Sequence, residues 1–147
     1  MLKRDSVGAT VFHMAYLLKR YKIARYLVQR YPMEALSPYA GGALVENDEG
    51  EMEYMSEEDM PYTGQNILHI TVIFKNIAET RWLLDFYRNH EHSAAHGLES
   101  LLIANAKGRF FDIHENPEFY FGGFPLLFAV CSGDPDMFDL VLSYASR

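Results

Sequence analysis

The chain has 147 residues, of which 49% are hydrophobic and 22% charged, so it can bury one core of ordinary size. The net charge of −7 comes from residues 31–74, which hold nine Asp or Glu and no Lys or Arg. The other charges nearly balance and leave no basic stripe for phosphates, which argues against nucleic acid as a partner.

The sequence also argues against a membrane-spanning helix and against secretion. The longest uncharged apolar run, residues 119–133, is shorter than the roughly 18 residues that a membrane-spanning helix needs. Cys131 has no second cysteine with which to form a disulfide, and no secretory signal opens the chain. We therefore expect a cytosolic chain without a transmembrane segment.

The first predicted unit covers residues 8–37. A turn at Gly8 precedes a short helix that Thr10 can cap, and a second helix follows after a tight turn. Apolar residues spaced by three and four predict a buried stripe along the second helix, with Arg25 turned toward water. The predicted stripe consists of Ile23, Ala24, Tyr26 and Leu27.

An insertion, residues 38–61, separates this unit from the next. Its acidic run from Glu46 to Asp59 is expected to be a solvated, mobile loop, because like charges repel one another. Calcium binding is the alternative, but the ligand spacing of a calcium-binding loop is missing. The sequence therefore gives no reason to place a metal there.

The second unit, residues 62–92, repeats the design with Gly64, Asn66 and His69. Asn66 stands where a side-chain oxygen can cap the short helix. Near its end, His92 and His96 are four residues apart and could share a helical face for a metal. An exposed polar loop is the preferred interpretation, because no cysteine or carboxylate pair completes a ligand set.

A second insertion, residues 90–121, leads to the third unit, residues 122–147. Gly122 opens that unit, Pro125 suits the first position of a helix, and Gly133 falls between the paired helices. The insertion is rich in aromatic residues, which either fold into a small core of their own or contact a neighbouring subunit. These residues are Phe110, Phe111, Phe119, Tyr120 and Phe121.

The three units follow one template. Each has a glycine five positions before His13, His69 or Leu127. The pattern resembles the ankyrin repeat, Gly-x-Thr-Pro-Leu-His-x-Ala, and implies an all-α ankyrin-repeat solenoid of about three helix pairs with long inserted finger loops. The template positions lie 56 and 58 residues apart, against a standard period of about 33, because of the two insertions. In this motif the histidine bonds backbone across repeat turns, and its replacement by Leu127 argues against catalysis.

The insertions make the resemblance more specific, because they point to one family of ankyrin-repeat proteins. Three segments are similar, in this order, to the third repeat, long finger and fourth repeat of TRPV cation channels: residues 62–70, Lys107-Gly108-Arg109-Phe110-Phe111, and residues 119–126 with 129–131. The first unit is similar to a repeat of the invertebrate sensory branch of that family. The resemblance implies the cytosolic N-terminal segment of a calcium-permeable channel, beneath the plasma membrane, that mediates subunit assembly and regulation. It implies homo- or hetero-tetrameric partners, fingers that contact neighbouring subunits and, in some members, calmodulin.

Part of the nucleotide-binding site of that family has matching residues in this sequence. Members that bind nucleotide use an aromatic residue and a glutamine, which match Tyr62 and Gln65. The charged residues that follow in the family are replaced by Ile73 and Phe74, so we expect weak nucleotide binding or none, and no cofactor.

An enzyme is not expected. Hydrolase and zinc-protease motifs are missing, and Cys131 lies on a helix that we expect to be buried, where a thiol is inert. The alternative to the channel is a free-standing ankyrin adaptor that binds a protein partner. Apolar stripes at both ends favour the channel, because they indicate an excerpt of a longer array. The stripes comprise Val11, Met14 and Leu18 at one end and Phe138, Val141 and Leu142 at the other.

Overall fold

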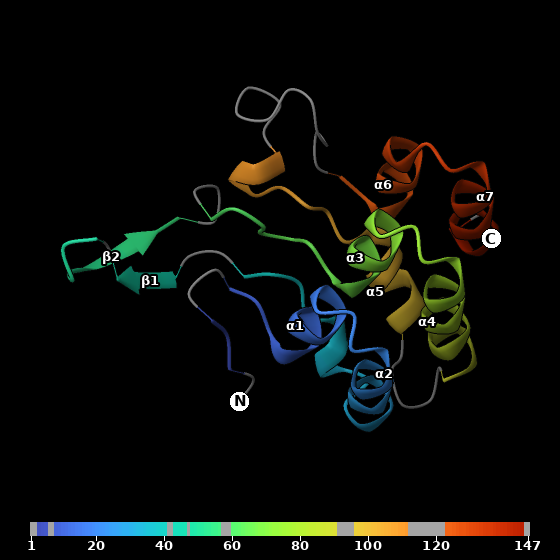
Figure 1. Ribbon diagram of the computed structural model, residues 1–147, viewed down its shortest axis with the longest axis horizontal. Coiled ribbons are helices and arrows are strands. Elements are labelled where there is room, and N and C mark those ends of the chain that lie inside the picture. The colour runs from blue at the N-terminus through green and yellow to red at the C-terminus, as the bar shows by residue number, and fades with distance from the viewer. Residues whose placement is uncertain are drawn as a thin grey trace.

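Three helix pairs, separated by two insertions, form the body of the protein (Figure 1). The computed structural model describes residues 3–5, 8–40, 43–46, 48–56, 60–90, 96–111 and 123–145. This part of the chain is mostly helical, as the sequence predicts. The pairs are α1 (Val11–Leu17) with α2 (Tyr21–Arg30), α3 (Ile67–Ile73) with α4 (Ile77–Asn89), and α6 (Pro125–Ser132) with α7 (Pro135–Ala145).

The pairs lie side by side in chain order. Helix α3 contacts both α1 and α6, while α4 contacts α7, so the second pair is the middle one (Figure 1). Residues 67–72 of α3 are all buried, because neighbours cover this helix on both sides. None of the helices in the described ranges is long and apolar enough to cross a bilayer.

Each short helix begins and ends at matched positions. Thr10 and Asn66 are the N-caps of α1 and α3, and Pro125 is the first residue of α6, where its missing N–H leaves no bond unmade. The turn to the second helix has a left-handed residue each time: Lys19, Lys75 and Gly133, with φ of 57°, 55° and 71°. Only the third copy uses glycine, the residue that adopts this conformation without strain.

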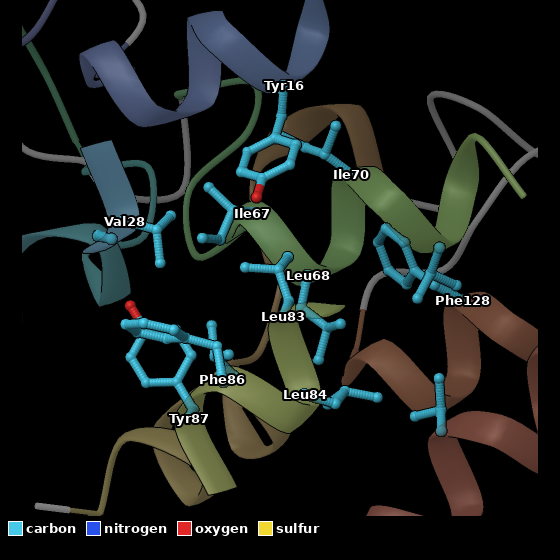
Figure 2. Packing of buried hydrophobic residues seen from close by; sticks show 14 of the residues in the cluster. Tyr16, Val28, Ile67, Leu68, Ile70, Leu83, Leu84, Phe86, Tyr87 and Phe128 are labelled. Carbon is cyan, nitrogen blue, oxygen red and sulfur yellow. The ribbon is translucent and has the colours of Figure 1, made fainter. Parts of the chain in front are cut away.

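The core follows the line of helix pairs. Tyr16 of α1 packs over Ile67 and Ile70 of α3, while Phe128 of α6 approaches from the opposite side (Figure 2). All four side chains are at most 1% exposed. At about 25 cal/mol per Å² of apolar area, burial of such residues is the main stabilising term.

The insertions contain structure of their own. The first forms a hairpin of β1 (Ala43–Glu46) and β2 (Met52–Met55), antiparallel, with Ala43 opposite Met55 and Glu46 opposite Met52. It points away from the helices (Figure 1). The all-α expectation is therefore wrong for this segment, and residues 46–59 are not wholly a loop. The remaining short helices are η1 (Glu34–Leu36), α5 (Gly97–Ile103) and η2 (Arg109–Phe111).

Four expectations about burial are wrong. Ile23 and Tyr26 are 52% and 61% exposed, because Ala24 and Val28 supply the buried face of α2. Val141, expected at an open end, is fully buried. Cys131, expected to be buried, is exposed. In each case the hydrophobic pattern identifies an apolar residue but not which side of its helix meets a neighbour.

The entry turn of the middle pair gives a sharp test of the packing. Gly64 has φ +89°, and a Cβ built there would lie 1.9 Å from the carbonyl oxygen of Asn105. Gly133 also has positive φ, +71°, but nothing lies within 4 Å of its Cβ position. We expect Gly64→Ala to cost roughly 3 kcal/mol or more in the free energy of unfolding, and Gly133→Ala only about 1 kcal/mol.

Urea denaturation followed by circular dichroism measures both values. Equal costs for the two variants would show that the contact between the turn and Asn105 contributes nothing beyond the backbone conformation.

Candidate functional site

His13 joins the first helix pair to the turn of the second. Its Nδ1 accepts a hydrogen bond from the backbone N–H of Thr10 at 2.9 Å, and its Nε2 lies 3.1 Å from the carbonyl oxygen of Gln65. Because a carbonyl can only accept, Nε2 carries the proton. The imidazole is therefore a neutral bridge between two backbone segments 52 residues apart in sequence.

His69 repeats this arrangement one pair further along. Its Nδ1 accepts from the N–H of Asn66 at 3.0 Å, and its Nε2 lies 3.0 Å from the carbonyl oxygen of Gly123. The Asn66 side chain also accepts hydrogen bonds from the N–H groups of Leu68 and His69, which caps α3. The same residue pattern thus produces the same contact twice.

Neither histidine is suited to proton transfer. Burial lowers the pKa of each to about 4, against an ordinary value of 6.5, and the hydrogen bonds to Gln65 and Gly123 offset this only in part. Both side chains are fully buried. At neutral pH the two rings stay uncharged and out of reach of a substrate.

The third pair carries Leu127 in place of a histidine, and this side chain is 48% exposed. Pro125 is buried at the start of α6, and Gly133 caps its end in the left-handed conformation. Gly122 lies outside the described residues. No following turn covers Leu127 in the described part of the chain.

The turns themselves form a hydrogen-bonded row, here called the turn edge, made of residues 8–10, 39–40, 60–66, 105–110 and 123. Ala40 donates to Gly8, and Gly64 donates to Tyr39, at 3.2 and 2.9 Å. Lys107 donates to Thr63 at 2.8 Å. The first insertion, through Tyr39 and Ala40, and the second, through Lys107, are therefore tied to the entry turns of the helix pairs.

Aromatic rings follow the turn edge. The ring centroids of His13 and Tyr39 are 4.2 Å apart, those of Tyr39 and Tyr62 5.4 Å, and those of Tyr62 and Phe110 5.3 Å. Phe110 is half-buried and packs against the core. This contact favours a local packing role for Phe110 over an exposed one. The side chain of Phe111, and all of Phe119, Tyr120 and Phe121, lie outside what the structure describes.

The proposed ligand pair, Tyr62 and Gln65, is used for packing. Tyr62 stands between two other rings, and Gln65 is 7% exposed, with its carbonyl oxygen accepting from Tyr39 N–H and His13. A hollow of about 490 Å³ lies nearby, but neither residue lines it. Its lining includes Arg4, Tyr39, Thr63, Asn105 and Lys107.

A partly buried ion pair, which the sequence does not reveal, connects the first two helix pairs. Glu79 of α4 is 2% exposed and accepts from the Tyr16 hydroxyl at 3.0 Å and from Arg25 at 2.7 and 2.9 Å. The Arg25 guanidinium also lies over the Trp82 ring, 4.9 Å from its centroid. The hydrogen bond with Glu79 raises the pKa of Arg25. Arg25, predicted to face water, instead joins two helix pairs.

The described ranges contain no group of three or more His, Cys, Asp or Glu that could hold a metal, and His92 lies outside these ranges. A groove of about 600 Å³ between α4 and α7 has Arg81, Arg88, Asp136 and Asp139 in its lining. Because its lining carries two arginines and two aspartates, the groove favours neither an anionic nor a cationic ligand.

Comparisons with known proteins add no identification. No protein-family model matches the chain, and no curated protein matches it. The residues and their geometry therefore carry the functional argument.

Proposed function

We propose that this chain is a non-catalytic repeat scaffold, an ankyrin-type stack of helix pairs, from the cytosolic N-terminal part of a TRPV-type, calcium-permeable cation channel subunit. Its role would be subunit assembly and the binding of regulatory partners. The observation that supports a stack of repeats is the repeated histidine bridge, in which His13 hydrogen-bonds to the Gln65 carbonyl and His69 hydrogen-bonds to the Gly123 carbonyl. Two bridges of the same form, one pair apart, are expected of a repeat and not of an irregular helical domain.

The channel assignment depends on the insertions. Both are rooted in the turn edge, where Lys107 bonds to Thr63 and Tyr39 bonds to Gln65 and Gly64. A finger held at its base by the scaffold can present its tip to a neighbouring subunit. The proposal therefore includes other subunits, in a homo- or hetero-tetramer, as partners, calmodulin as a regulatory partner, and the cytosolic side of the plasma membrane as the location.

The second candidate is an ankyrin adaptor that acts without a channel. The same row of helix pairs would serve it, because the fold alone does not specify the partner. Exposed apolar residues at both ends of the stack, such as Val11 at 51% and Val130 at 56%, favour a segment of a longer array.

Reading the transcript beyond Arg147 separates the two. For a channel subunit we expect further repeats followed by six hydrophobic spans of about 20 residues each. A reading frame that stops soon after Arg147 would leave the adaptor as the better proposal.

A further inference from the structure

A hollow of about 490 Å³ opens on the turn edge, where the bases of both insertions meet the entry turn of the middle helix pair. Because its walls come from both insertions and from the turn between them, the hollow lies within the row of pairs and not at an end of it. Among the described residues that line it, five side chains can donate a hydrogen bond and none is acidic. The five are Arg4, Tyr39, Thr63, Asn105 and Lys107.

The guanidinium of Arg4 is fixed on one side and lacks a carboxylate partner. Its Nη1 donates to the carbonyl oxygens of Gly8 and Pro38, at 2.7 and 2.8 Å, which uses both N–H groups of that nitrogen. Arg4 forms no ion pair within the described residues, and the carboxylate of Asp5 accepts from the N–H of Ala9 instead. Loss of hydration lowers the pKa of Arg4, and no acidic group opposes this change. An anion bound to the remaining N–H groups would stabilise the charged side chain.

Thr63 has a hydroxyl group without an acceptor. Its side chain is 2% exposed, and within the described residues its Oγ1 forms no hydrogen bond. The carbonyl oxygen of Thr63 accepts from the N–H groups of Lys107 and Gly108, at 2.8 and 3.1 Å, which holds this residue against the base of the second insertion. A buried hydroxyl without a partner costs stability. A ligand oxygen in the hollow that accepts from this hydroxyl would remove that cost.

The charge of the surroundings selects the kind of anion. Two cationic residues, Arg4 and Lys107, line the hollow, but the whole chain carries a net charge of −7. Residues 31–74 supply much of the lining and hold nine acidic residues and no Lys or Arg. A ligand with several negative charges is repelled by this field. A single carboxylate carries only one charge, and its two oxygens match the fork that Nε and Nη2 of an arginine form.

We propose that the hollow binds one carboxylate group, with the free fork of Arg4 on its two oxygens and the Thr63 hydroxyl as a further donor. Lys107 adds positive charge on the same lining. The carboxylate belongs either to a free small acid or to an acidic side chain of a protein partner. The second source rests on the proposed function and deepens it, because it gives the scaffold an acidic partner segment to bind. Tyr62 and Gln65, which match a nucleotide site, are not part of this lining.

Nuclear magnetic resonance of the ¹⁵N-labelled whole chain tests the proposal. Sodium acetate replaces sodium chloride at constant ionic strength and pH 6.5, while the Nε–H signal of Arg4 and the backbone N–H signals of Thr63 and Lys107 are followed. We expect all three signals to shift and to saturate together. Sulfate, a dianion at this pH, should bind more weakly than acetate.

Two variants of the lining and one matched control show whether these side chains make the site. Thr63→Val removes only a hydroxyl without a partner, so we expect undiminished stability in urea and about fivefold weaker acetate binding. Arg4→Lys keeps the charge but loses the fork, and should weaken binding about tenfold. Arg20→Lys makes the same change at an exposed position outside the lining and should bind acetate like the wild type.

Signals that shift linearly with acetate and do not saturate would overturn the proposal. Tighter binding of sulfate, or a Thr63→Val chain that binds acetate as tightly as the wild type, would overturn it as well. The α-amide of N-acetylglutamate separates the two sources, because its single carboxylate stands on a peptide-like side chain. Tighter binding of this probe than of acetate supports a protein partner, and equal binding supports a free acid. None of these outcomes bears on the channel assignment, which the transcript tests separately.

Discussion

Acidification from pH 7 to about pH 4 is expected to remove roughly 3 kcal/mol of stability for each of the two bridging histidines. Burial lowers the pKa of His13 and of His69 to about 4 in the folded chain, whereas both titrate near 6.5 when unfolded. The unfolded chain therefore binds more protons between these values. The stabilisation is fully present above pH 6.5 and is lost as the pH falls toward 4. Urea denaturation at a series of pH values measures it.

His69→Leu isolates one contribution, since the third pair carries Leu127 at the same position. The variant should lose about 1–3 kcal/mol at pH 7.5, because the Asn66 N–H loses its acceptor and the Gly123 carbonyl keeps only the N–H of Ala106 as a donor. Its remaining loss between pH 6.5 and 4 should be smaller than that of the wild type by roughly 3 kcal/mol. His96→Gln, at an exposed position, is the control. An unchanged pH dependence in His69→Leu would contradict the assignment.

His13 has charged neighbours that His69 lacks. Arg4 lowers the pKa of His13 and Asp5 raises it, so these two influences partly oppose each other. For His69, burial is opposed only by hydrogen bonds to the backbone of Gly123 and Ala104. His69 is therefore the cleaner position for the titration experiment.

Arg25→Met is expected to cost roughly 2–4 kcal/mol in the free energy of unfolding, because it leaves the carboxylate of Glu79 buried without its cation. Glu79 is 2% exposed and would keep only the Tyr16 hydroxyl among its side-chain partners. Arg25 is 40% exposed, which places the cost at the lower end of the range for buried pairs. Urea denaturation at pH 7.5 gives the value.

A double-mutant cycle makes this test specific. Arg25→Met/Glu79→Met should be more stable than Arg25→Met alone, because no charge then remains buried. The control is Arg88→Met, whose partner Asp85 is 39% exposed, and we expect it to cost less than about 1 kcal/mol. Equal losses at the two arginines would mean that burial of Glu79 does not decide the strength of the pair.

The residues that begin and end helices can be recognised in this sequence, because their effect depends only on nearby backbone. Thr10 and Asn66 precede helices, Pro125 begins one and Gly133 ends one, and each depends on the backbone of the next few residues only. The mostly helical character follows from such signals. The sequence does not predict the hairpin at residues 43–55, because a run of acidic residues has the composition of a loop and the pairing of β1 with β2 depends on the turn at Gly50.

By itself the sequence determined where helices begin and end and that one design recurs three times, since turn glycines, caps and apolar spacing act within a few residues. Only the tertiary structure decided the partners of those elements. It placed Arg25 against Glu79, 54 residues away, and lined up Tyr39, Tyr62 and Phe110 along the turn edge. It also decided that Ile23 is exposed while Met137 is buried, because burial depends on which side of a helix meets a neighbour.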